Sequence, residues 1–288
     1  MAVCVTCNLC ENPGTLSEAV EVAQVPCNVR KFRDNVFTIW RCSSCRSLHC
    51  KEDPDLPTYY AEYPLKLQRL AFSQRIGYGN RLRLMKRQGV RTSDRILDYG
   101  CGSGIFVNYL RENEFSNVTG YDPFVTEYAS PETLREQYDT VVSYDVIEHY
   151  DDPRDFLGRI VRLVRPGGLL VIGTPNADHL SLTHTCDPGL HPPYHRHIFS
   201  ERMLLTLAGE EGLEPVDIYR RSFYDSLVPT VNSRFMWRYV EKSDGLLDAA
   251  VEPPNAKLVL GSPELIRLAF FGYWLPAKDN ILVTFRKN

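Results

Sequence analysis

Long apolar runs and surplus positive charge are both absent from this sequence. No apolar stretch approaches the ~20 residues that span a bilayer, and the first residues lack the basic and apolar regions of a secretory signal peptide. We therefore expect a cytoplasmic protein with no membrane partner. The 33 Lys and Arg side chains are outnumbered by 36 Asp and Glu side chains, which gives a net charge of −3. Because no basic stripe can follow a phosphate backbone, nucleic acid is not favoured as a substrate.

Cysteine, by contrast, is abundant and unevenly distributed. The chain has 288 residues, of which 43% are hydrophobic, enough for a globular core, and nine are cysteines. Seven of the nine fall within the first fifty positions. In a reducing compartment such clustering favours metal binding over disulfide bonds. Besides the isolated Cys27 they are Cys4, Cys7, Cys10, Cys42, Cys45 and Cys50.

Two Cys-x-x-Cys turns dominate this N-terminal part. Cys7 with Cys10, and Cys42 with Cys45, each place two thiolates on one tight turn. Two such turns can close a tetrahedral zinc site, so we predict a zinc-ribbon module over residues 1–52. The zinc would be structural, because four thiolates leave no open coordination position.

Neighbouring residues leave alternatives for this ligand set open. Cys4 has a Cys-x-x-Cys spacing of its own, and His49 or Cys50 could replace a ligand. Zinc knuckles often have glycine directly after the second cysteine, where the backbone is tight. This chain has Glu11 and Arg46 at those two positions.

Residues 53–91 are predicted to be a linker followed by a helical segment. The prolines between 53 and 64 exclude a continuous helix there, and the tyrosines among them are expected to pack onto the next domain. Between 65 and 89 apolar residues recur at helical spacing among many Arg and Lys, which indicates a solvated amphipathic helix. We expect Gly77 and Gly79 to interrupt it.

A glycine-rich turn follows the next apolar run, at residues 95–104. Two apolar residues lead into Asp98, and glycines then alternate with small side chains, so a buried strand is predicted to turn sharply into a helix. A dinucleotide fingerprint would have its third glycine at Ile105. A carboxylate at Asp98 would repel a phosphate but suits an ammonium group. The turn residues are Gly100, Cys101, Gly102 and Gly104.

This motif resembles the first motif of class I S-adenosylmethionine-dependent methyltransferases. The resemblance implies an α/β fold with a Rossmann-like sheet whose last strand is antiparallel, over residues 92–288. It also implies S-adenosyl-L-methionine as cofactor. Asp98 would hold the amino end of its methionine moiety, while the turn from Gly100 to Gly104 lets the backbone approach it.

A second acid lies about twenty residues further on. Residues 118–121 are typical of a buried strand, and Asp122 at its end is predicted to accept hydrogen bonds from the ribose hydroxyls. Only sixteen residues separate Asp122 from Asp139, where most class I methyltransferases have a helix and a third strand. Residues 128–130 could be a residual strand, and the adenine-contacting residue cannot be named.

The predicted fourth strand, 140–144, leads into the candidate catalytic residues. Asp145 follows it and is assigned to the cofactor, and Glu148 and His149 come next, ahead of an Asp-Pro pair. This order resembles the methyltransferases that act on small molecules, including ubiquinone-type O-methyltransferases and deoxysugar C-methyltransferases. His149, with Glu148, would remove a proton from the acceptor as the methyl is transferred. Alternatively, both residues cap or brace the following helix.

The remainder of the chain completes this pattern. A helix over 156–164, a Pro-Gly-Gly turn and a strand at 169–173 are predicted. A loop rich in His and Pro then precedes a helix over 201–212, and the irregular spacing of its histidines argues against a metal site. Strands at 213–220 and 280–286 enclose an insertion, about 221–279, which is a candidate substrate cap whose aromatics could equally be core.

The function predicted is methyl transfer from S-adenosylmethionine to oxygen or carbon of a small-molecule acceptor. One alternative is a zinc-ribbon RNA base methyltransferase, for which only the Arg-rich segment 69–91 offers a basic face. The other is a non-catalytic protein that retains a cofactor fold for binding. The acceptor and the oligomeric state are not readable from the sequence.

Overall fold

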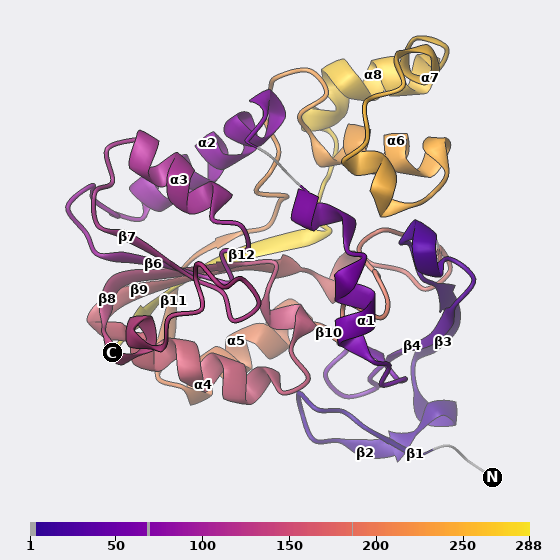
Figure 1. Ribbon diagram of the computed structural model, residues 1–288. Coiled ribbons are helices and arrows are strands. Elements are labelled where there is room, and N and C mark those ends of the chain that lie inside the picture. The colour runs from indigo at the N-terminus through magenta and orange to yellow at the C-terminus, as the bar shows by residue number, and fades with distance from the viewer. Residues whose placement is uncertain (1–3, 68–69, 186) are drawn as a thin grey trace.

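A six-stranded sheet with helices on both faces forms the centre of the computed structural model, which describes residues 4–67, 70–185 and 187–288. The strand order is β11-β12-β9-β8-β6-β7. Two helices cover one face and two cover the other (Figure 1). The first pair is α2 (Phe72–Arg87) and α3 (Ile105–Glu112), and the second is α4 (Pro153–Leu163) and α5 (Glu201–Glu210).

The strand directions confirm the predicted fold class. Strand β6 is parallel to both of its neighbours, and β8 is parallel to β9. The last strand, β12, is antiparallel to β9 and to β11. The carboxyl ends of the parallel strands therefore meet at one edge, where α/β sheets bind ligands. The bounds are β6 (Ile96–Tyr99), β7 (Val118–Tyr121), β8 (Tyr138–Tyr144), β9 (Val164–Pro175), β11 (Leu213–Tyr219) and β12 (Asn280–Lys287).

The prediction of a residual strand at 128–130 is wrong. The segment between β7 and β8 holds turns and one short 3-10 helix, η4 (Pro131–Arg135), so β7 lies at the sheet edge. Tyr128 fills part of the space that the usual helix would occupy. A Cβ on Gly120 would lie 2.9 Å from the Tyr128 ring. The loop is thus packed onto the sheet by a side chain rather than by another strand.

The predicted interruption of the helix at Gly77 and Gly79 is also wrong. Helix α2 runs through both glycines without a break. A Cβ on Gly79 would lie 3.2 Å from the Tyr109 hydroxyl of α3, and one on Gly77 would contact Tyr224 at 3.7 Å. These glycines allow close packing, which outweighs their lower helix propensity of about 1 kcal/mol each.

The N-terminal module, residues 1–52, contains a β-sheet that the rest of the chain completes. Strands β3, β4 and β5 are antiparallel, and β10 from the methyltransferase-like part adds a fourth strand beside β5. A separate hairpin, β1 with β2, carries the first thiolate turn (Figure 1). The domain boundaries remain a prediction. The bounds are β1 (Cys4–Thr6), β2 (Pro13–Thr15), η1 (Leu16–Glu18), β3 (Glu21–Pro26), η2 (Arg30–Phe32), β4 (Val36–Arg41), β5 (Leu48–Cys50) and β10 (His197–Ile198).

The linker packs against the second domain through its tyrosines, as expected. Helix α1 (Leu56–Ala61) ends before the 3-10 helix η3 (Pro64–Leu67), so no continuous helix forms. The rings of Tyr59, Tyr60 and Tyr63 lie 6.1, 5.3 and 4.8 Å from the ring of Tyr194. Tyr194 itself is fully buried. The linker is therefore an ordered wall of the second domain.

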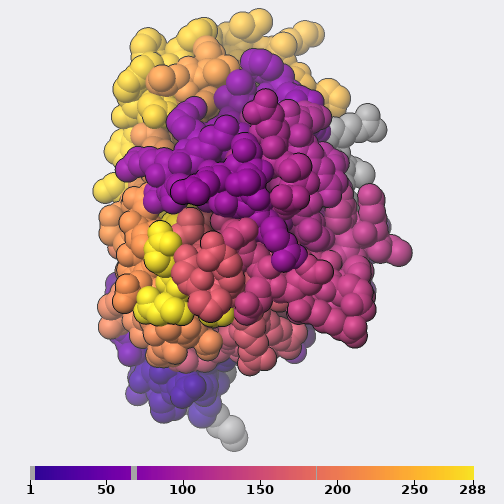
Figure 2. Space-filling view, turned by 90° about the vertical axis from the view of Figure 1, so that its left-hand side faces the viewer, coloured from indigo at the N-terminus to yellow at the C-terminus, as the bar shows by residue number. Residues whose placement is uncertain are grey.

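The insertion 221–279 forms a small helical unit, which we call the cap. It has its own apolar core and lies above α2 in Figure 2. Phe270, Phe271 and Trp274 are 55%, 60% and 63% exposed, so these aromatics are not core residues. Within the described residues no helix is long and apolar enough to cross a bilayer. The cap elements are α6 (Ser233–Ser243), η7 (Leu247–Ala250), α7 (Ala256–Leu260), α8 (Pro263–Phe271) and η8 (Gly272–Trp274).

Candidate functional site

The glycine turn after β6 has the backbone that its sequence demands. Gly100, Gly102 and Gly104 have φ values of 82°, 53° and 72°, in the left-handed region that side chains disfavour. A Cβ on Gly100 would lie 2.3 Å from a methyl group of Val146. Cys101 lies between the glycines and donates its N–H to the carbonyl of Tyr121 at 3.1 Å. The turn thus presents bare backbone at the carboxyl edge of the sheet.

Two of the three acids predicted to hold the cofactor lie at the ends of adjacent strands at this edge. Asp98 is 4% exposed, and this burial raises the pKa of its carboxyl group to about 7. Asp122 follows β7 and accepts the N–H groups of Gly102 at 3.0 Å and Phe124 at 2.9 Å. Asp122 therefore also stabilises the glycine turn, a role that the sequence did not reveal.

Arg81 is a site residue that sequence reasoning missed. We expected the basic residues of this helix to be solvated, but Arg81 is 6% exposed, and its Nε has no partner among the described residues. Its guanidinium lies 4.2 Å from the ring centre of Tyr144 and 4.5 Å from that of Tyr224. The sequence signal that could have identified Arg81 was its spacing. It follows Tyr78 by three positions, which places it on the apolar side of α2.

Asp145 faces Arg81 from the end of β8. The two side chains approach to 3.6 Å, and the Tyr224 hydroxyl donates a hydrogen bond to the same carboxylate. Burial raises the pKa of Asp145. Its φ of 55° is unusual for a residue other than glycine. The backbone conformation directs this acid toward the buried cation.

Glu148 and His149 form the short 3-10 helix η5 (Ile147–His149) beside this edge. Glu148 is fully buried, its Oε2 accepts a hydrogen bond from Thr174 at 3.0 Å, and its Oε1 has no partner. Burial raises the pKa of Glu148 well above its usual value, because the charged carboxylate is desolvated. Asp152 caps α4 by accepting the N–H of Asp155, so neither Glu148 nor His149 is the cap.

His149 is oriented by the chain around it. Its Nδ1 lies 2.9 Å from the carbonyl oxygen of Tyr194 and 3.0 Å from the Tyr60 hydroxyl. Because a carbonyl only accepts, Nδ1 carries the hydrogen and Nε2 is the atom that can take up a proton. Burial lowers the pKa of His149 to about 4, although the Tyr194 and Asp145 carbonyls favour the charged ring. The imidazole is therefore neutral at pH 7.

Two histidines of the His-rich loop join this site. The ring of His195 lies 4.9 Å from that of His149, and His191 lies 5.0 Å from His195. Candidate ligand atoms of Glu148, His149 and His195 fall within 4.8 Å of one another, so the tertiary structure places an acid from outside the loop beside its histidine. We call Glu148, His149, His191 and His195 the acceptor-side cluster. His179 and His184 are exposed elsewhere.

The four predicted zinc ligands also meet, at the start of the chain. The sulfur atoms of Cys7 and Cys45 are 3.6 Å apart, and those of Cys10 and Cys42 are 3.7 Å apart. A tetrahedral zinc with Zn–S bonds of ~2.3 Å places sulfurs about 3.8 Å apart, so the four thiolates fit the metal. Burial and the contact with Cys45 raise the pKa of Cys7, while the hydrogen bond from Cys7 lowers that of Cys45.

The alternative ligands lie outside this cluster. Cys4 is exposed in β1, and burial raises the pKa of the Cys50 thiol to about 12. His49 places Nε2 3.2 Å from the Cys7 sulfur, so it contacts a ligand rather than replacing one. Glu11 and Arg46, which replace the usual glycines, have φ values of 58° and 68°. Both turns therefore keep the knuckle conformation at a steric cost.

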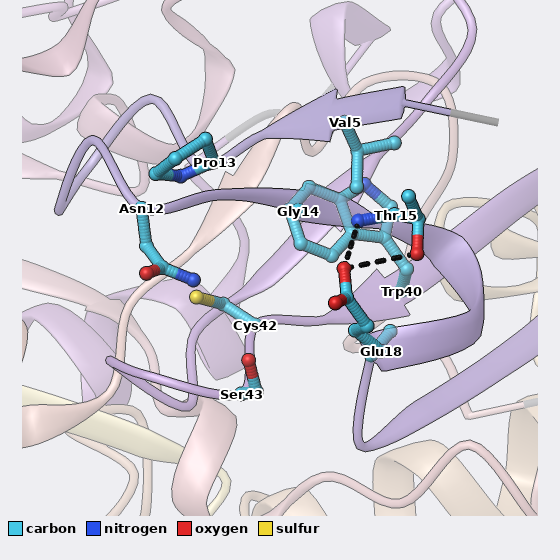
Figure 3. A pocket seen from close by; sticks show the side chains of 10 residues that line it. Val5, Asn12, Pro13, Gly14, Thr15, Glu18, Trp40, Cys42 and Ser43 are labelled. Atoms are coloured by element: carbon cyan, nitrogen blue, oxygen red, sulfur yellow. Dashed lines mark hydrogen bonds between the residues drawn. The ribbon is translucent and has the colours of Figure 1, made fainter. Parts of the chain in front are cut away.

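A hollow of about 250 Å³ lies beside the second thiolate turn. Its lining residues come from the N-terminal module and not from the glycine turn. Figure 3 shows Glu18, Trp40 and Cys42 among its lining residues. Glu18 accepts hydrogen bonds from the N–H of Thr15 at 2.7 Å and from its hydroxyl at 2.9 Å. The carboxylate is thus used to close a local turn and offers little to a ligand.

Comparison with known proteins identifies the family. A family model described as a methyltransferase domain matches residues 66–218, more than half of the chain. The chain belongs to the methyltransferase domain family. The matched residues include the glycine turn, the acids Asp98, Asp122 and Asp145, and η5, and they exclude the N-terminal module and the cap.

Individual relatives of this methyltransferase domain are distant. It is 31% identical over 102 residues to the ubiquinone biosynthesis O-methyltransferase of Bradyrhizobium sp. (strain ORS 278), covering 28% of this chain and 40% of the relative. The Klebsiella pneumoniae enzyme of the same name is 28% identical over 124 residues, covering 35% and 49%. The match spans less than half of these curated relatives.

Solved structures with related folds are more remote in sequence. The 1,6-didemethyltoxoflavin-N1-methyltransferase of Burkholderia thailandensis has 16% identity and a TM-score of 0.45, covering 88% of this chain and 96% of that one. The N-methyltransferase NodS of Bradyrhizobium japonicum has 16% identity and a TM-score of 0.41, with coverage of 78% and 91%.

The knuckle geometry yields a stability prediction. Arg46 is exposed and has a left-handed backbone, which costs a residue with a Cβ roughly 1–2 kcal/mol. Arg46→Gly should therefore stabilise the metal-loaded module by about 1 kcal/mol, whereas Arg46→Ala should not. A competition titration with a zinc chelator, read by released metal, measures the difference. Equal behaviour of the Gly and Ala variants would contradict the assigned strain.

The buried histidines yield a pH prediction. Burial lowers the pKa of His191 from its usual 6.5 to about 3, so the folded protein holds this ring neutral while the unfolded chain protonates it. Its contribution to stability is complete above pH 6.5 and is lost as the pH falls toward 3. As the pH falls, the free energy of unfolding should decrease less steeply in His191→Asn than in the wild type. The two slopes should differ by up to ~1.4 kcal/mol per pH unit. Urea midpoints across this range test it, and parallel curves would refute it.

Proposed function

We propose that the protein transfers a methyl group from S-adenosyl-L-methionine to oxygen or carbon of a small-molecule acceptor. The observation that carries this proposal is the meeting of a bare glycine turn, two acids and a buried cation at one sheet edge. Asp98 would hold the cofactor's ammonium group and Asp122 its ribose hydroxyls. Arg81, whose Nε is unpartnered, would hold the cofactor's carboxylate, with Asp145 positioning it.

The acceptor would meet the cofactor beside η5. The cofactor supplies an electrophilic methyl group when bound, and the acceptor atom must lose a proton as it takes that methyl. His149 is neutral at pH 7, and its Nε2 has a free lone pair under the tautomer that the Tyr194 carbonyl selects. Glu148 is buried with a raised pKa and an unpartnered Oε1 among the described residues, and it would orient the acceptor by a hydrogen bond.

The N-terminal thiolates would hold zinc in a structural role. Sulfur spacing, burial and the two knuckle turns support this assignment. All four sulfurs point to one centre, so no position is left for a substrate or water. The zinc would stabilise the fold of a small sheet whose apolar core is shared with the His-rich loop.

A small-molecule acceptor has more support than RNA. The curated relatives are named for ubiquinone biosynthesis, in which a small molecule is O-methylated. The basic face needed for RNA is weakened, because Arg81 is buried and Arg75 pairs with Glu112 at 2.6 Å. Arg69, at the start of that segment, lies outside the described residues. A cytoplasmic location remains a prediction.

Cofactor binding is the first test. Asp98→Asn and Asp122→Asn should each weaken binding of S-adenosylhomocysteine more than ~10-fold, because each removes a charge-assisted hydrogen bond. Glu112→Gln, at the far end of α3, is the matched control and should bind like the wild type. Isothermal titration measures all four proteins. If the wild type at high concentration gave no heat of binding, the proposal would be contradicted.

The acceptor class and the base can be tested together. Purified protein is incubated with methyl-labelled cofactor and fractionated cell extract, and label should appear in the small-molecule fraction. His149→Ala should lower that label ~100-fold or more with nearly unchanged cofactor affinity, because only the proton transfer is removed. His179→Ala, an exposed histidine, is the control.

Other outcomes of this experiment separate the alternatives. Label in RNA would replace the small-molecule proposal with the RNA one. Cofactor binding without transfer to any fraction would favour a non-catalytic binding protein. Full activity of His149→Ala would remove His149 from the chemistry while leaving the cofactor site intact.

A further inference from the structure

The N-terminal module and the His-rich loop share one β-sheet. Strand β10 pairs with β5, so that His197 lies opposite His49 and Ile198 opposite Leu48. Next to this pair, Cys50 donates its N–H to the carbonyl of Arg196 at 3.0 Å. Arg196 in turn donates its own N–H to the carbonyl of Glu148 at 2.8 Å. An unbroken run of backbone hydrogen bonds therefore connects the module to η5.

The second thiolate turn also holds the start of α5. Ser200, the N-cap of α5, donates its hydroxyl to the carbonyl of Cys45 at 2.7 Å. The N–H of Ser200 reaches the hydroxyl of Ser47 at 3.0 Å, and Arg202 donates to the carbonyl of Ser44 at 2.6 Å. The end of the His-rich loop is thus fixed to the turn that carries two predicted zinc ligands.

A second junction lies at the opposite end of the same sheet, at Asn28 between β3 and η2. The side-chain oxygen of Asn28 accepts a hydrogen bond from Nδ1 of His191. The backbone carbonyl of Asn28 accepts the N–H of Leu247 in the cap at 2.7 Å. Two residues on, the N–H of Arg30 reaches the carboxylate of Asp248 at 2.9 Å. One residue of the module therefore contacts both the acceptor-side cluster and the cap.

His191 needs an external partner to keep its position. Its φ of 38° is in the left-handed region, which a side chain other than glycine disfavours by roughly 1–2 kcal/mol. The residue is 4% exposed, and its ring stacks on Tyr194 at 4.6 Å. Among the described residues, Asn28 supplies the one hydrogen bond of the His191 side chain, and Nε2 is buried without a partner.

From these contacts we infer that the N-terminal module is a working part of the acceptor site, and that Asn28 is the positioning residue that couples it to His191 and the cap. The inference rests on the proposed function in one respect, that the acceptor-side cluster faces the acceptor. Asn28 itself touches no reacting atom. It fixes the tautomer of His191, because an amide oxygen only accepts, and this leaves the lone pair on Nε2, next to His195 in the acceptor-side cluster.

The coupling is local, because the two halves of the site depend on different partners. Asp98, Asp122 and the glycine turn are held by β6, β7 and one another. Within the described part of the chain, the hydrogen bonds of Asp122 and the glycine turn do not involve the N-terminal module. Loss of the Asn28 contact should therefore loosen the segment 189–199 and the cap segment 245–252 while leaving the cofactor half unchanged.

The test compares Asn28→Ala, Asn28→Asp and the control Gln24→Ala in the full-length, zinc-loaded protein. Gln24 also lies in the module, and its side-chain amide bonds only within it, to Thr38 at 3.1 Å. Amide hydrogen exchange over 189–199 and 245–252 should speed up at least ~10-fold in Asn28→Ala. Exchange over 96–121, zinc content and affinity for S-adenosylhomocysteine should match the wild type.

Asn28→Asp separates positioning from mere packing, because a carboxylate still accepts from Nδ1 of His191. It should restore slow exchange and the protected imidazole N–H signal of His191 in NMR, which Asn28→Ala should lose. Unchanged exchange over 189–199 in Asn28→Ala, or an equal rise in Gln24→Ala, would overturn the inference. Absence of cofactor binding in every protein would instead reject the proposed function and leave the exchange result to stand by itself.

Discussion

Burial of unlike charges at the carboxyl edge of the sheet is the constraint on which the site depends. Arg81 and Asp98 are 6% and 4% exposed, and Asp145 lies 3.6 Å from Arg81. Removing such groups from water costs several kcal/mol each, and their attraction offsets this only with good partners. Aromatic rings face the guanidinium, and Nε stays unpaired. A zwitterionic amino-acid group carries the two charges that would complete this arrangement, which gives a physical reason for burying ions there.

The shortened segment after β7 changes what surrounds that edge. Without a third strand, the loop after Asp122 leaves Phe124 88% exposed, and its ring stacks at 6.3 Å on Tyr60 of the linker. Tyr60 also reaches His149 through its hydroxyl at 3.0 Å. A side chain of the linker therefore joins the ribose-side loop to the candidate base. The linker thus supplies packing contacts for the loop after Asp122, which has no neighbouring third strand.

The N-terminal module is integrated with the methyltransferase domain rather than tethered to it. Its sheet is completed by β10, and its second thiolate turn fixes the N-cap of α5. The apolar residues of this sheet form one buried cluster with residues of the His-rich loop, so packing against the larger domain stabilises it. The proposed metal ligation would stabilise it further. Because the same hydrogen bonds also reach η5 and the cap, stability of the module and order of the acceptor side have a common physical origin.

The sequence by itself determined the features that depend on local geometry. Alternating glycines predicted the sharp turn, the two Cys-x-x-Cys turns predicted the thiolate cluster, and residue patterning predicted most strands and helices, because these follow from backbone sterics and periodicity. The antiparallel last strand was expected only from the family resemblance. Only the tertiary structure decided which distant groups meet. Arg81 became a buried site residue, His191 and His195 joined Glu148 and His149, and Asn28 reached the cap. Such contacts depend on how separate elements pack, and residue spacing along one segment does not encode that.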